Sequence, residues 1–146
     1  MEKFRKGVFI VTYRKEKDKI LYLLLKRKLH WNGWEFPKGG VETFEFRKSA
    51  AKRELKEETG QFHIKIKSYR IKGKYLYNKK YPGRKGFSGQ TYKLYSAEIK
   101  NKNIKIDKKE HSDYEWLDFN QAWKILTWPN QKMCLNIVNK TLEKIK

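Results

Sequence analysis

GGVETFEFRKSAAKRELKEETG, residues 39–60, is the stretch of this chain that decides how the rest is interpreted. On a helix, Glu54, Glu57 and Glu58 are spaced by three and four residues, so their carboxylates project from one face. We call these three residues the acidic cluster. Like charges this close on a helix repel each other unless a cation lies among them. Because the whole chain carries a formal net charge of +20, such a cluster is unusual here and predicts a divalent-metal site.

The segment resembles the signature of the Nudix hydrolases, in which spaced glycine and glutamate residues precede the pattern Arg-Glu-aliphatic-any-Glu-Glu-any-Gly. All of these positions are filled, by Gly39, Glu45, Arg53, Glu54, Leu55, Glu57, Glu58 and Gly60. Two residues depart from the family's pattern. Gln61 stands where an aliphatic residue is usual, with Phe62 beside it to fill the same pocket. Phe44 stands where the family often has glycine.

The resemblance implies a fold and a chemistry. The fold would be the Nudix fold, an α/β (α+β) arrangement with a mixed β-sheet sandwiched between α-helices, and residues 1–146 would form a single domain of this kind. The acidic cluster and the backbone carbonyl of Gly39 would hold Mg²⁺, with Mn²⁺ as an alternative. One of these glutamates, or one further downstream, would act as general base. Arg53 would pair with Glu45 or Glu57 and so orient the carboxylates.

Residues 34–40, WEFPKGG, carry information about the substrate. A tryptophan shortly before Pro-Lys-Gly resembles Nudix enzymes that act on dinucleoside polyphosphates, on RNA 5′ ends and on diphosphoinositol polyphosphates. The resemblance implies that Lys38 reaches the phosphate chain. Trp34 either contacts the substrate or packs at a strand edge, and Phe36 is expected in the core.

Residues 110–117, EHSDYEWL, resemble a stretch of the asymmetric diadenosine tetraphosphate hydrolases. The resemblance implies that Glu110 is a further metal ligand or a base, and that Tyr114 stacks on a nucleobase. His111 is a weaker candidate for a functional residue.

A second group of aromatic residues lies further upstream. Tyr75, Tyr77 and Tyr81 alternate along an expected strand and therefore share one face, beside several lysines. This pattern suits either packing under a helix or stacking on a base, and it favours base stacking for Tyr77. Gly89-Gln90 resembles, more weakly, a pair in bacterial enzymes that remove pyrophosphate from RNA 5′ ends.

Charge and composition limit the class of protein. The 36 Lys and Arg residues against 16 Asp and Glu attract polyanions such as nucleic acids, but lysines spread over the chain also suit a solvated surface. The only cysteine, Cys134, cannot form an intrachain disulfide and fits a reducing compartment. With neither an apolar run of membrane-spanning length nor a signal-peptide pattern, we expect a cytoplasmic protein without a membrane partner.

Hydrophobic periodicity predicts the order of strands and helices. Strands are expected at residues 6–14 and 20–26 as a hairpin, then at 62–71, 74–81, 91–99 and 115–117. Helices are expected from about residue 46 to Gly60, from 119 to 126 after an Asp118 cap, and from 130 to 146. The inward stripe of the last helix would be Leu135, Val138, Leu142 and Ile145. Residues 28–37 and 82–86 are expected to be loops.

The leading functional hypothesis is a Mg²⁺-dependent pyrophosphohydrolase that cleaves nucleoside polyphosphates, with a dinucleoside polyphosphate such as diadenosine tetraphosphate as substrate. A second hypothesis is an RNA 5′-end pyrophosphohydrolase or decapping enzyme, suggested by the charge and by the basic segment 79–85. A third is a Nudix-fold module that binds RNA without catalysis. The intact carboxylates argue against the third, because such modules tend to lose the acidic cluster.

Overall fold

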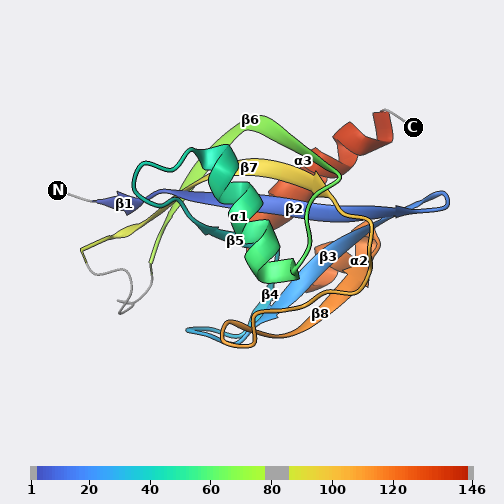
Figure 1. Ribbon diagram of the computed structural model, residues 1–146, viewed down its shortest axis with the longest axis horizontal. Helices are drawn as coiled ribbons and strands as arrows, with labels where there is room; N and C mark the ends of the chain where they lie inside the picture. The colour runs from blue at the N-terminus through green and yellow to red at the C-terminus, as the bar shows by residue number, and fades with distance from the viewer. Residues whose placement is uncertain (1–2, 78–85, 145–146) are drawn as a thin grey trace.

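A computed structural model describes residues 3–77 and 86–144. Within these residues the chain builds one mixed sheet that lies between helices (Figure 1). The strand order is β1-β7-β2-β3-β4, while β5, β6 and β8 pair with β2, β7 and β3. The strands are β1 (Phe4–Arg5), β2 (Gly7–Glu16), β3 (Lys19–Arg27), β4 (Gly33–Glu35), β5 (Lys38–Gly40), β6 (Lys65–Leu76), β7 (Gly89–Glu98) and β8 (His111–Leu117).

The centre of the sheet consists of the two most apolar segments of the chain and their neighbour. β2 and β3 form the expected antiparallel hairpin, with Tyr13 opposite Tyr22. β2 also pairs in parallel with β7, so it lies between two strands and is buried over most of its length. Continuous apolar runs are typical of strands that are covered on both faces. The sheet therefore needs a helical layer on each side.

Two hydrophobic clusters show how the layers form. On one face, Ala51 and Leu55 of α1 (Arg47–Thr59) pack with residues of β2, β3 and β7. On the other face, α2 (Phe119–Ile125) and α3 (Pro129–Lys144) contribute Ala122, Leu135 and Val138, among others. The α+β class and the sandwiched mixed sheet are thus confirmed. No helix within the described residues is both long and apolar enough to cross a membrane.

The helix boundaries follow their capping residues. α1 ends where Gly60 adopts the left-handed conformation, at φ 75°, and its N–H donates to the Lys56 carbonyl. Asp118 caps α2 through a capping box with Gln121. In α3 the predicted stripe is buried at Leu135, Val138 and Leu142, whereas Ile145 lies outside the described residues.

Three local expectations are wrong. The strands expected at 62–71 and 74–81 are one strand, β6, because Gly73 does not break it but makes room for the ring of Tyr92. The loop expected at 28–37 contains β4, which pairs with β3. Phe62 does not fill a pocket, since its side chain is 71% exposed. Tyr81 and the segment 79–85 lie outside the described residues, which resume at 86.

Candidate active site

Strand β5 brings the chain into close contact with helix α1. It pairs with β2, with Gly39 opposite Val8, and α1 packs alongside it. A Cβ placed on Gly39 would lie 2.0 Å from the Glu54 carboxyl carbon, so only glycine leaves room for that carboxylate. Glycine is therefore required here for close approach, and the glutamate lies directly against the strand.

Arg53 ties the loop before α1 to the helix. Its guanidinium donates two hydrogen bonds to Glu45, of 2.8 and 2.9 Å, and one of 2.8 Å to the carbonyl of Gly40. It also donates to Glu54 at 2.8 Å and lies 3.3 Å from a Glu57 oxygen. The hydrogen bonds from Arg53 are the main reason why the pKa of Glu45 falls to about 2. Arg53 therefore orients carboxylates from two segments at once.

The three glutamates of the acidic cluster differ in burial. Glu58 is 2% exposed and accepts a 3.0 Å hydrogen bond from the backbone N–H of Lys38, whereas the Glu57 side chain is 56% exposed. Burial raises the pKa of Glu54 to about 7, against the lowering effect of Arg53. Burial also raises the pKa of Glu58 well above its usual value, and the negative charges of neighbouring carboxylates add to this. Both carboxylates lie where a cation would stabilise their charged form.

Further potential metal ligands come from the start of β8. Glu58, Glu110 and His111 each place one potential ligand atom within 4.8 Å of the others. His111 Nε2 lies 2.8 Å from Glu35 Oε2, while its buried Nδ1 has no hydrogen-bond partner among the described residues. Carboxylate oxygens with a neighbouring imidazole suit a hard or borderline divalent cation. The donor set and the bare nitrogen therefore fit a divalent metal ion.

A buried anion lies beneath this region. Glu35 is 0% exposed, and it is 3.3 Å from Arg27 Nη1 and 3.4 Å from Lys38 Nζ. Burial alone would raise its pKa, but the charges of Lys38 and Arg27 and the hydrogen bond with His111 lower it to about 2. Glu35 thereby holds two cations and one imidazole from different segments in place.

We expect that replacing Glu35 by glutamine destabilises the protein by about 3–5 kcal/mol, because breaking a buried pair leaves uncompensated charge. The folded pKa of Glu35 lies below its ordinary value of 4.5, so its stabilisation is present above about pH 4.5 and is lost as the pH falls toward 2. Urea unfolding of both proteins across this pH range measures the difference. Glu16→Gln, which breaks the exposed pair with Arg14, is the control and should change stability little. Equal effects of the two substitutions would contradict the role of Glu35.

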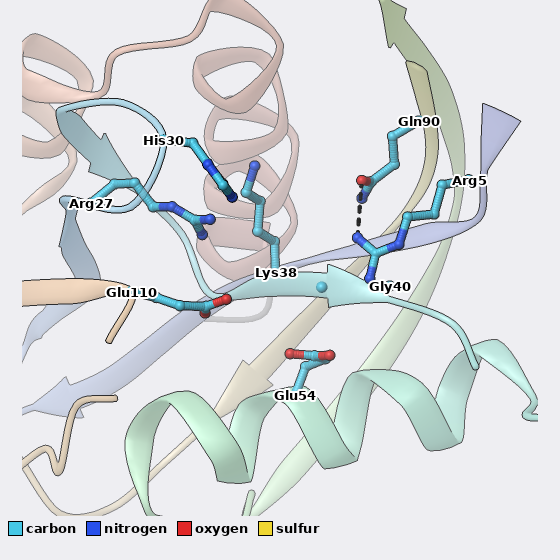
Figure 2. A pocket seen from close by; sticks show the side chains of 9 residues that line it. Arg5, Arg27, His30, Lys38, Gly40, Glu54, Gln90 and Glu110 are labelled. Atoms are coloured by element: carbon cyan, nitrogen blue, oxygen red, sulfur yellow. Dashed lines mark hydrogen bonds between the residues drawn. The ribbon is translucent and has the colours of Figure 1, made fainter. Parts of the chain in front are cut away.

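A polar cavity opens between β5, α1 and β1 (Figure 2). Figure 2 shows Glu54 projecting from α1 toward β5, with Lys38 and Arg5 on the other side of that strand. Arg5 donates a 3.5 Å hydrogen bond to Gln90, and a Cβ on Gly40 would meet the Arg5 guanidinium at 2.1 Å. We call this cavity, of about 190 Å³, the carboxylate pocket; it is lined by Arg5, Arg27, His30, Lys38, Gly39, Gly40, Glu54, Gln90 and Glu110.

A second cavity, of about 400 Å³, shares Lys38 with the first. Five of its eleven lining residues are aromatic. Lys38 Nζ lies 5.9 Å from the ring centre of Trp31 and 5.8 Å from that of Tyr75. Trp31 packs edge-on against Trp128, with ring centres 5.1 Å apart. We call this cavity the aromatic pocket; it is lined by Phe9, Trp31, Lys38, Lys74, Tyr75, Leu76, Tyr77, Trp128, Pro129, Asn130 and Gln131.

The predicted substrate residues are distributed unevenly over these cavities. Lys38 lines both, and Tyr77 lines the aromatic pocket, where its hydroxyl donates to Gln90 at 3.2 Å. Trp34 packs against the core cluster on the α3 face, and Tyr114 packs against the cluster on the α1 face. Neither lines either of the two pockets. Phe36 is 1% exposed in the core, as expected.

Several residues of these pockets were not predicted from sequence. Arg5 reaches the carboxylate pocket because β1 pairs in parallel with β7, which places it beside Gln90. Trp31 and Trp128 meet although they are distant in the chain. The one feature of the sequence that points to this contact is the presence of tryptophans at 31, 34 and 128. Sequence alone does not indicate which tryptophan turns toward a cavity.

Comparisons with known proteins agree with this arrangement. A family model described as NUDIX domain matches residues 3–135. Two curated proteins named RNA pyrophosphohydrolase are similar in sequence. The protein from Campylobacter jejuni subsp. doylei is 29% identical over 131 residues, covering 83% of this chain and 81% of that protein. The protein from Nitratiruptor sp. is 31% identical over 120 residues, covering 75% and 74%.

Among solved structures, the binary complex of an Ap4A hydrolase from C. elegans is similar in fold. It superimposes with a TM-score of 0.77 at 26% sequence identity. The match covers 96% of this chain and 98% of that one.

Proposed function

This chain belongs to the Nudix hydrolase family, and we propose that it uses a divalent cation, Mg²⁺ or Mn²⁺, to cleave a dinucleoside polyphosphate such as diadenosine tetraphosphate. The observation that carries the proposal is the meeting of the two pockets at Lys38. A phosphate chain suits the carboxylate pocket, and a nucleoside suits the aromatic pocket beside it. The likeness to the Ap4A hydrolase fold, at 26% identity, supports this choice of substrate.

Side chains in the carboxylate pocket and in the acidic cluster beside it would have separate roles. Glu54, Glu58 and Glu110 would hold the cation, with Glu57 and the Gly39 carbonyl as further candidate ligands. The bound cation supplies neutralisation of phosphate charge and orientation of a water for in-line attack. Lys38 and Arg5 would bind phosphate oxygens, because both cations line the cavity and their side chains are held by neighbours.

Proton transfer would fall to a carboxylate that faces the cavity. Glu54 and Glu110 both line the carboxylate pocket, and one of them would accept the proton of the attacking water, while the other would hold the cation together with Glu58. Arg53 would act as a positioning residue, since its 2.8 Å hydrogen bond fixes the Glu54 carboxylate. We include a cytoplasmic location in the proposal, because Cys134 is a buried free thiol.

A second candidate substrate is RNA with a 5′-triphosphate. The two relatives described above are both named RNA pyrophosphohydrolase. The net charge of +20 would also attract an RNA chain. Both substrates present a phosphate chain next to a nucleoside, so the shared arrangement of pockets supports each of them.

We expect the purified protein with Mg²⁺ to release ATP and AMP from diadenosine tetraphosphate, measured by chromatography of the products. The same preparation is tested on 5′-triphosphorylated RNA at low and moderate salt. If RNA is the better substrate, about three phosphate contacts along the strand would raise its KM about twentyfold for a fourfold increase in salt, while the KM for the dinucleotide changes less. The Glu58→Gln protein controls for contaminating hydrolases. A folded protein that cleaves neither substrate would contradict the proposed function.

A further inference from the structure

One buried amide forms hydrogen bonds with a residue of each pocket. Gln90 of β7 is 1% exposed and belongs to the lining of the carboxylate pocket. Its Oε1 atom accepts a 3.2 Å hydrogen bond from the hydroxyl of Tyr77 and one of 3.5 Å from Arg5 Nη1. An amide oxygen has two lone pairs and can accept both bonds at once. Because Tyr77 lines the aromatic pocket and Arg5 the carboxylate pocket, this oxygen connects the two.

The orientation of the Gln90 amide is fixed by its surroundings. Arginine can only donate hydrogen bonds, so the amide oxygen, and not its nitrogen, must face Arg5. On the nitrogen side, a Cβ placed on Gly7 would lie 2.2 Å from Gln90 Nε2. Only glycine at position 7 therefore leaves room for the amide. Held from both sides, the amide is a fixed point for the side chains that bind to it.

Backbone pairing holds the three segments together. Gln90 lies opposite Arg5 in the parallel pair of β1 and β7. The Tyr77 N–H donates a 2.9 Å hydrogen bond to the Ser88 carbonyl, and the Ser88 N–H donates one of 2.7 Å to the Lys3 carbonyl. The side chains of Tyr77 and Arg5 therefore approach Gln90 from segments whose relative positions are already set.

The position of the Arg5 guanidinium depends on this amide. Figure 2 shows the guanidinium beside Gly40, with the hydrogen bond to Gln90 as the dashed line. A Cβ on Gly40 would lie 2.1 Å from Arg5 Nη2 and 2.7 Å from its Nε, so the guanidinium lies against the backbone there. Among the described residues, Gln90 is the only side chain that forms a hydrogen bond with Arg5. Without it, the long and flexible side chain would be free to adopt other rotamers.

We propose that Tyr77 and Gln90 are positioning residues for the phosphate chain: the Tyr77 hydroxyl fixes the Gln90 amide, and the amide holds Arg5 where it binds phosphate oxygens. This inference rests on the proposed nucleotide substrate, and it adds two residues that set the position of a phosphate-binding cation. One N–H of Arg5 is used by Gln90, and the other N–H groups remain available for phosphate. A cation that is held in advance loses less freedom on binding than a mobile one. The Tyr77 hydroxyl thus acts on the phosphate end of the substrate, although Tyr77 lines the aromatic pocket.

Tyr75 and Tyr77 provide a matched pair for the test. Both line the aromatic pocket, and their rings pack edge-on with centres 6.1 Å apart. The Tyr75 hydroxyl has no hydrogen-bond partner among the described residues, whereas that of Tyr77 donates to Gln90. Replacing either tyrosine by phenylalanine keeps the ring and removes only the hydroxyl. Only Tyr77→Phe is therefore expected to change the position of Arg5.

The test measures the binding of methylenediphosphonate by titration calorimetry in excess Mg²⁺. This ligand resembles a phosphate chain but has no base to enter the aromatic pocket, and its P–C–P bridge is not hydrolysed. We expect Arg5→Gln and Gln90→Met each to weaken binding about tenfold. Tyr77→Phe should weaken it about threefold to tenfold, and Tyr75→Phe should leave it unchanged. In a protein that already carries Arg5→Gln, Tyr77→Phe should have no further effect, since the effects of residues in one network are not additive.

Tyr77→Phe keeps the test decisive even if Gln90→Met does not fold. Unchanged affinity of the Tyr77→Phe protein for methylenediphosphonate would overturn the inference. So would an equal effect of Tyr77→Phe with and without Arg5→Gln, or failure of the unmodified protein to bind. Because no turnover is measured, a protein that shows the expected binding but cleaves no nucleotide would contradict only the proposed function. In a protein that does cleave, Tyr77→Phe should raise KM much more than it lowers kcat.

Discussion

Replacing Glu58 by glutamine is expected to lower kcat about a thousandfold or more while making the metal-free protein more stable. The loss of activity follows from the proposed place of Glu58 among the metal ligands, since a catalytic cation lowers the free energy of the transition state by about several kcal/mol. The gain in stability follows from its burial, which raises the pKa of this carboxyl group together with the charges of Glu35 and Glu54. A glutamine of the same shape can still accept the hydrogen bond from Lys38.

The pH dependence separates this explanation from simple damage to the fold. The folded pKa of Glu58 lies above its ordinary value of 4.5, so its carboxylate destabilises the metal-free fold increasingly as the pH rises above that value. Thermal unfolding in a chelator should therefore show a larger gain for Glu58→Gln at about pH 8 than at about pH 5. Added Mg²⁺ should raise the Tm of the unmodified protein and not that of the variant.

Glu115 provides the matched control for this substitution. It is an exposed glutamate of β8 that lines neither pocket and does not belong to the group Glu58, Glu110 and His111, so Glu115→Gln should change neither kcat nor the response to Mg²⁺. A Glu58→Gln protein that is less stable without metal and still responds to Mg²⁺ would show that Glu58 has a structural role instead.

Local sequence signals were sufficient for the elements that carry the acidic cluster. Helical spacing placed Glu54, Glu57 and Glu58 on one side of α1, and Gly60 marked the end of that helix, as observed. Spacing could not show that Glu58 is buried and Glu57 exposed. That difference depends on how α1 docks against β5, where the Lys38 N–H meets Glu58. It is a tertiary contact between residues with no local relation in the chain.

Contacts between distant segments account for most of what was not predicted. The ion pair of Glu35 with Arg27 and its hydrogen bond with His111 join three strands. Nothing in the sequence around Glu35 indicates these distant partners. The left-handed conformation of Phe44, at φ 64°, gives a physical reason why glycine is common at that position of the family. In this chain a fully exposed phenylalanine adopts that conformation.

The second large effect is expected from Gly39→Ala, which should lower kcat about a hundredfold without unfolding the protein. Gly39 does not have a positive φ, so its backbone conformation accepts alanine. The new methyl group would lie 2.0 Å from the Glu54 carboxyl carbon and 2.3 and 2.4 Å from its oxygens, which is too close for any contact. The Glu54 carboxylate must therefore move, although Arg53 holds it at 2.8 Å. Displacement by about 1 Å is enough for a loss of this size.

The neighbouring glycine offers a matched comparison, because Gly40→Ala would displace the end of the Arg5 side chain instead of a carboxylate. We expect Gly40→Ala to raise KM with little change in kcat, and Gly39→Ala to lower kcat. A double variant tests whether Gly39→Ala lowers kcat by displacing Glu54. If it does, the protein with both Gly39→Ala and Glu54→Gln should have nearly the same kcat as Glu54→Gln alone, since the effects of residues in contact are not additive. If the two reductions in kcat multiply in the double variant, Gly39→Ala acts through the strand backbone and not through Glu54.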